Sequence, residues 1–96
     1  MKELIEKFSD LYAQLYEGAR SNSGIDEDLL DKTKQALLEI REVSRYLDCL
    51  PKSLVNLFVD MQAALMSCAD RHEPEMAKRI FRAADVLSDI ARDIAS

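Results

Sequence analysis

The sequence is poor in the residues that disulfides, rigid loops and catalytic centres use. Among 96 residues there are two cysteines, two prolines, two glycines, one histidine and no tryptophan. Two cysteines are too few for a disulfide framework and fit a reducing compartment, whereas scarce glycine and proline leave room for long helices. A single histidine removes most sites that pair a nucleophile with a base or that gather several metal ligands. These absences favour a helical protein without catalytic machinery.

Long apolar runs are also missing. Nowhere do about 18 consecutive apolar residues occur, as a transmembrane helix requires, and residues 1–8 lack the apolar core of a signal peptide. The formal net charge of -5 repels phosphate groups, so it disfavours nucleic acid or an anionic membrane surface as the partner. We therefore expect a cytoplasmic protein that binds neither nucleic acid nor membrane.

The overall composition is that of a folded chain. Hydrophobic residues make up 48% of the sequence and charged residues 32%, which is atypical of disorder. The length suffices for one modest core but not for a core plus a deep, enclosed active site. We predict a single helical-bundle domain that spans residues 1–96.

Apolar residues recur at helical spacing in four segments separated by short breaks. The first segment covers about residues 3–20. It ends at residues 21–24, because Gly and Asn accept left-handed backbone and Ser competes for helical hydrogen bonds. The apolar stripe of this segment consists of Leu4, Phe8, Leu11, Leu15 and Ala19.

The second and fourth segments have clear start signals. The second opens at Ser23 or Asp26 with an imperfect capping box, and its apolar stripe extends to Leu47 before the stop at Pro51. The fourth starts at Pro74, whose fixed dihedral suits the first helical position. Helices of about 18 to 22 residues with short connections predict an all-α fold, an antiparallel up-down-up-down four-helix bundle. The chief alternative is a more open helical array that is completed only on dimerisation.

The third segment, residues 51–71, is the most apolar of the four. Between Ser53 and Ala69 the only charged residue is Asp60. One stripe is suited to the core and consists of Leu54, Phe58, Met61, Leu65 and Cys68. A helix that is apolar nearly all round is either central or presents its spare face to a partner, and a four-helix bundle has no central helix. The predicted partner-binding residues are Val55, Val59, Met66, Phe81 and Tyr16.

Candidate chemistry is sparse. Cys68 and His72 lie four residues apart, a spacing that offers two ligands to zinc, but no third ligand accompanies them. Cys49 would lie roughly 23 Å from Cys68 along the third helix, which excludes a disulfide between them. The chain also lacks the paired Glu-x-x-His motifs of carboxylate-bridged di-iron bundles. The sequence predicts no catalytic residue, no metal site and no cofactor.

Three stretches resemble a known family. The run Leu15-Tyr16-Glu17-Gly18-Ala19 resembles the Leu-Tyr-Asp-Gly-Ala signature of the flagellin-specific export chaperones, the FliS family. Residues 56–61 and 86–93 are similar to two later helices of that family. The family's first helix continues past its Gly-Ala pair, whereas residues 21–24 break it here. The resemblance implies a cytoplasmic four-helix chaperone that wraps a disordered terminal segment of a secreted or flagellar subunit and prevents its premature polymerisation.

The leading hypothesis is therefore a protein-binding adaptor or export chaperone that docks a partner segment on an apolar helix face. Two alternatives remain open. One is a small acidic inhibitor, of the phage or antitoxin type, that occupies a basic site with the acids at Asp26, Glu27, Asp28 and Asp31. The other is a structural homodimer that buries Val55 and Val59 against a second copy.

Overall fold

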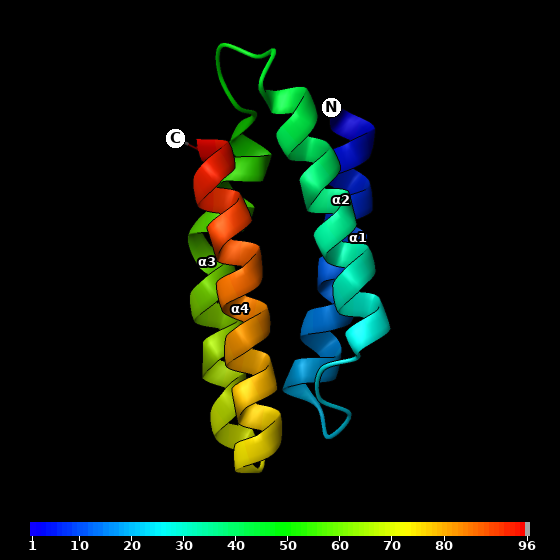
Figure 1. Ribbon diagram of the computed structural model, residues 1–96, viewed down its shortest axis with the longest axis vertical. Helices are drawn as coiled ribbons and strands as arrows, with labels where there is room; N and C mark the ends of the chain where they lie inside the picture. Colours follow the sequence, from blue (N-terminus) through cyan, green and yellow to red (C-terminus); the bar gives the residue numbers. More distant parts are fainter. Residues whose placement is uncertain (96) are drawn as a thin grey trace.

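The computed structural model describes residues 1–95 as a bundle of four α-helices, with no β-strand in that range (Figure 1). The helices are α1 (Lys2–Arg20), α2 (Glu27–Ser44), α3 (Lys52–Cys68) and α4 (Pro74–Ala95), and a 3-10 turn, η1 (Ala69–Arg71), follows α3. The body measures 42 × 20 × 17 Å, and the helices run along its longest dimension. The all-α bundle predicted from helical spacing is confirmed.

The break after α1 falls where the sequence places it. The hydroxyl of Ser21 donates to the carbonyl oxygen of Gly18 at 3.1 Å and replaces a helical hydrogen bond at the end of α1. Gly24 then turns the chain with a φ of +74°, a left-handed conformation that side chains oppose. Its N–H donates to Gly18 O at 2.7 Å, and this close approach leaves no room for a side chain at Gly18, where a Cβ would lie 2.7 Å from the carbonyl oxygen of Gly24. A Cβ at Gly24 would instead meet the side chain of Met76. The connection therefore folds back tightly on the end of α1.

The start of α2 resolves the two options that the sequence left open. Asp26, and not Ser23, is the N-cap, because its carboxylate accepts hydrogen bonds from the N–H groups of Asp28 and Leu29. The predicted extent of α2 is wrong at its other end. The helix stops at Ser44, where the hydroxyl donates to Arg41 O at 2.8 Å, so Leu47 lies in the connection of residues 45–51.

The four helices form two hairpins that pack side by side. The first hairpin is α1 with α2, and the second hairpin is α3 with α4; α1 also packs against α3, and α2 against α4. Chain direction alternates from each helix to the next, so the two helices within each hairpin are antiparallel, as predicted, but the pairs α1–α3 and α2–α4 run parallel (Figure 1). Arg79 pairs with Glu27 at one end of α2 and α4, and Arg41 with Asp93 at the other, as parallel helices require.

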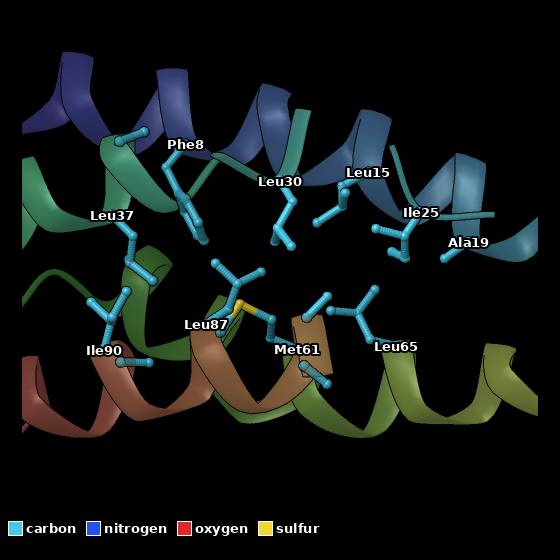
Figure 2. Packing of buried hydrophobic residues seen from close by; sticks show 14 of the residues in the cluster. Phe8, Leu15, Ala19, Ile25, Leu30, Leu37, Met61, Leu65, Leu87 and Ile90 are labelled. Atoms are coloured by element: carbon cyan, nitrogen blue, oxygen red, sulfur yellow. The ribbon is translucent and has the colours of Figure 1, made fainter. Parts of the chain in front are cut away.

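The core lies between the hairpins and receives side chains from all four helices. Figure 2 shows Phe8, Leu15 and Leu37 of the first hairpin directed toward Met61, Leu65 and Leu87 of the second. The predicted core stripe of α3 is buried at Leu54, Met61, Leu65 and Cys68, whereas Phe58 is only half-buried at the edge toward α4. Ile25 also enters the core from the first connection, although no helical spacing singled it out.

Candidate functional site

An apolar face lies on the outside of the second hairpin. Val59 projects from α3 with 72% of its surface exposed, and Val55 and Met66 on the same helix are exposed to 41% and 39%. Phe81 on α4 is exposed to 39%. These four residues are named the apolar face below. Four of the five residues predicted to bind a partner are thus accessible to one.

The antiparallel pairing of α3 and α4 brings the four residues to one side of the molecule. Gln62 donates from Nε2 to Asp85 Oδ1 at 3.4 Å across the middle of the pair. Met66 lies one turn after Gln62, and Phe81 lies one turn before Asp85, so antiparallel geometry places them at corresponding heights. Val59 lies on the other side of this contact and lines a hollow together with residues of α4.

That hollow measures about 210 Å³ and lies in the seam between α3 and α4. Small residues of α4 make its floor, and its lining is Phe58, Val59, Gln62, Ser88, Ala91, Arg92 and Ala95. Ser88 is 6% exposed, and its hydroxyl oxygen has no hydrogen-bond partner within residues 1–95. A buried hydroxyl without a partner is unfavourable, so the seam retains one unsatisfied polar group beside an apolar niche.

Basic side chains stand at both ends of the apolar face. Lys52 begins α3 three residues before Val55, and Lys78 and Arg82 flank Phe81 on α4. None of these three makes an ion pair with any residue in 1–95. Nearer the middle, Asp89 pairs with Arg92 at 3.0 Å, whereas Asp85 accepts only from the neutral amide of Gln62 and keeps its negative charge. Unpaired cations therefore lie toward the two ends of the face, although the chain as a whole carries -5.

Tyr16, the fifth predicted residue, lies elsewhere. It lines a shallow groove of about 410 Å³ between α1 and α3, together with Tyr12, Leu57, Met61 and Ala64. These residues occupy the opposite flank of α3 from Val55, Val59 and Met66. The structure therefore does not bring Tyr16 together with the other four.

The two tyrosines of the groove belong to a stacked row of aromatic rings on α1 that begins at the buried Phe8. Tyr12 stacks between Phe8 and Tyr16, with ring centroids 6.1 and 6.3 Å away. Its hydroxyl donates to the backbone oxygen of Met61 at 3.3 Å and ties α1 to α3. Burial raises the pKa of Tyr12 to about 12, and the neighbouring Tyr16 adds to that rise. The row therefore behaves as part of the packing between the hairpins.

Three large apolar residues outside α3 and α4 are exposed and were not predicted to bind a partner. Val43, near the end of α2, is 36% exposed. Tyr46 is 88% exposed, and Leu47 is 41% exposed beside it in the connection of residues 45–51. Leu47 and Val55 line the same hollow at that end of the bundle, so the connection extends the accessible apolar surface. The signal that could have revealed Tyr46 and Leu47 is Ser44 just before them, whose side chain competes for the hydrogen bonds of the helical backbone.

The two residues with metal-ligand spacing serve other purposes. Cys68 is buried, its thiol donates to Ala64 O at 3.3 Å, and burial raises the pKa of that thiol. The Nε2 of His72 lies 2.6 Å from Ala19 O at the end of α1, where a donor satisfies a terminal carbonyl. Within residues 1–95 no three His, Cys, Asp or Glu side chains are grouped so as to hold a metal ion.

The acids that motivated the inhibitor hypothesis also have structural partners. Asp26 caps α2, and Glu27 pairs with Arg79 at 3.3 Å. Acids in the first turn of a helix are favoured by its dipole. Three of the four acids at residues 26–31 therefore contribute to the stability of α2, whereas Asp31 lies beyond its first turn.

The fold and its surface define a small acidic helical bundle with one apolar, basic-edged face. Comparison with protein-family models, curated proteins and solved structures gives no match. The Gly18-Ala19 pair of the family resemblance has a local explanation, since Gly18 admits the backbone of Gly24 and Ala19 is fully buried. None of the helices within residues 1–95 combines the length and hydropathy that crossing a bilayer requires.

Proposed function

We propose that this chain is a protein-binding adaptor of the chaperone type, which holds a helical segment of another protein against the apolar face. The observation that carries the proposal is Val59, a valine with 72% of its surface exposed in the middle of a helix. An isolated exposed apolar residue is ordinary, but Val55, Met66 and Phe81 join it on the same side of the second hairpin. A surface of this kind is typical of a docking site.

The size of this side of the molecule suits a protein partner. The body is 42 Å long and 17 to 20 Å wide, so one side approaches the roughly 800 Å² that each partner buries in a standard protein complex. Met66 adds an unbranched, adaptable side chain, which helps one surface to fit a helix. The resemblance to the flagellar export chaperones makes a segment of a secreted or flagellar subunit the first partner to test, in the cytoplasm.

The two alternatives are weaker on different grounds. Charge mimicry by the acids at residues 26–31 has less support, because two of the four, Asp26 and Glu27, already have partners within the bundle. A homodimer would use the same apolar face as the proposed partner, so the experiment must separate binding of another protein from binding of a second copy.

The test is site-specific photo-crosslinking in the native host. A photoreactive amino acid replaces Val55 in an otherwise unchanged chain and, separately, in a Val59→Glu background. A matched control carries the same amino acid in place of Gln14, an exposed residue of the first hairpin. We expect an adduct with one other protein from position 55, at least tenfold less of it in the Val59→Glu background, and none from position 14.

Two results would contradict the proposal. An adduct that contains only a second copy of the chain would identify a structural homodimer. Equal adducts from positions 55 and 14 would show that the apolar face has no special affinity. Sedimentation of the isolated protein provides the independent measure of self-association.

A further inference from the structure

The chemistry of the partner can be read from the charges around the apolar face. Because α3 and α4 are antiparallel, the start of α3 and the end of α4 share one end of the face, where Lys52 and Arg92 lie. The start of α4 lies at the other end and contributes Lys78 and Arg82, with the exposed Glu75 one turn before Lys78. Each end of the face therefore carries at least one cation.

Most of this charge is not used within the bundle. Lys52, Lys78 and Arg82 have no ion-pair partner among residues 1–95, whereas Arg92 pairs with Asp89 on its own helix. The acidic excess of the chain lies largely in the other half of the sequence: residues 1–51 contain eleven acidic and seven basic side chains, and residues 52–96 contain seven and six. Cations left free beside an apolar surface favour an approaching segment that carries carboxylates.

A second copy of the chain is a poor match for this pattern. If two copies met through the face in antiparallel orientation, Lys52 of one would approach Lys78 of the other. In parallel orientation each lysine would approach its own counterpart. Like charges are juxtaposed either way, which costs binding energy, so the pattern favours a different chain.

The hollow beside Val59 supplies an anchor point. An apolar cavity of about 150 Å³ is large enough to hold a benzene ring, so a hollow of about 210 Å³ admits one bulky apolar side chain. Its wall includes the exposed side chain of Val59 and the small side chains of Ala91 and Ala95. A side chain seated there would also come next to Ser88, whose hydroxyl lacks a partner.

Given the proposed function, we infer that the partner is an amphipathic helix of another protein, with a bulky apolar side chain for the hollow at Val59 and carboxylates that meet Lys52 and Lys78. This preference for an acidic partner is opposite to the preference that the net charge of the whole molecule would give. Long-range attraction to a chain of net charge -5 would favour a basic peptide. A preference for an acidic peptide can therefore come only from the local cations.

The experiment uses two synthetic helical peptides of 18 residues, about 27 Å long, with identical leucine positions on the apolar side. One carries glutamates beside the leucines and the other carries lysines at the same positions. Binding to the full chain is measured by titration, with the methyl NMR signals of Val55 and Val59 as the report on location. We expect the glutamate peptide to bind at least tenfold more tightly at low salt, with the ratio shrinking as the salt concentration rises.

Charge-reversal variants provide the control. The double variant Lys52→Glu, Lys78→Glu should lose or reverse the preference for the glutamate peptide. The matched variant Lys32→Glu, Lys34→Glu makes the same change in net charge on the first hairpin and should preserve the preference.

Each other outcome overturns the inference in a recognisable way. Equal binding of both peptides, or tighter binding of the lysine peptide, with shifts at Val55 and Val59 contradicts the acidic partner but leaves a docking face, so the proposed function stands. No shift at these valines with either peptide also overturns the inference, and the crosslinking experiment then decides the proposed function separately. Dimers of the chain that bury Val59 would contradict both.

Discussion

The two hairpins bury their inner surfaces in the same way but differ on their outer surfaces. Each contributes helices to one shared core, and each keeps its antiparallel pair closed by a short connection. In the first hairpin only one large apolar side chain is exposed among the described residues, Val43 at the end of α2 with 36% of its surface, whereas α3 and α4 expose Val55, Val59, Met66 and Phe81. The stability of the bundle does not require this difference, because the first hairpin folds with a largely polar exterior. The proposed docking therefore depends on the apolar face of the second hairpin.

The strongest test of this contrast compares two positions on α3. Leu65 is fully buried in the core, and Leu65→Glu should lower the free energy of unfolding by about 4 kcal/mol or more, because a carboxylate would lose its water without gaining a partner. Val59→Glu should change it by about 0.5 kcal/mol or less, since the substitution is exposed to solvent. Circular dichroism and thermal melting of both variants measure the difference.

A Val59→Glu protein that melts many degrees below the wild type would place Val59 in the core. The apolar face would then be part of the bundle's own packing, and the contrast between the hairpins would fail. Gln14→Glu on the first hairpin is the matched control, because it adds the same carboxylate to an exposed helical position.

Helical spacing predicted most of this architecture because burial and exposure alternate with the turn of the helix. It separated Leu54 and Leu65 from Val55 and Val59 without any coordinates. It placed the end of α2 too late, because the hydrogen bond from Ser44 to Arg41 competes with a continuing apolar stripe at Leu47. Local signals of this kind decide helix ends but have little weight in a periodic pattern.

The candidate site was only partly predictable. The row on α3 follows from one helix, but which residues of other helices join it depends on the arrangement of the bundle. Phe81 joins because α4 is the antiparallel neighbour on that flank, and Tyr16 does not, because α1 packs on the other flank. The meeting of Lys52 with the end of α4, and of Lys78 with the end of α3, likewise requires knowledge of the neighbours.

The next largest effect on stability is expected from the connections within the two hairpins. The first connection depends on Gly24, the only residue in 1–95 with a positive φ, and a Cβ there would also lie 2.6 Å from the Sδ of Met76. Gly24→Ala should therefore lower the free energy of unfolding by about 1–2 kcal/mol, mainly through the left-handed backbone. Glu73→Ala in the second connection should have little effect, because that connection contains no such residue. Denaturant midpoints of the two variants would be compared, and equal midpoints would show that the first connection can adopt another conformation.

A smaller effect is expected from the helix cap of the first hairpin. The carboxylate of Asp26 accepts from the N–H groups of Asp28 and Leu29 at 3.0 and 3.2 Å, whereas Pro51 before α3 provides no side-chain cap. Asp26→Ala should destabilise the protein by about 1 kcal/mol, or lower its melting temperature by about 4–8 °C. Asp31→Ala removes the same charge from an exposed position beyond the cap and is the control. A similar loss in both variants would attribute the effect to charge and not to capping.

The smallest expected effect concerns the contact between the hairpins that Tyr12 of α1 makes with α3. Burial raises the pKa of this tyrosine to about 12 in the folded protein, against about 10 in an unfolded chain. The folded state therefore holds the proton more tightly, so the contribution is fully present below pH 10 and is lost as the pH rises from about 10 to about 12. Tyr12→Phe should lose no more than about 1 kcal/mol at pH 8, where only the 3.3 Å bond to Met61 O is missing. Above pH 10 the wild type should lose stability faster than Tyr12→Phe, and denaturant unfolding at pH 8 and pH 11 measures this difference.

The control is Tyr46→Phe, which alters an exposed residue of the connection and should keep the pH dependence of the wild type. If the stability of Tyr12→Phe and of the wild type declines in parallel as the pH rises, Tyr12 is not buried between α1 and α3. The hairpins are then held together there by apolar packing alone.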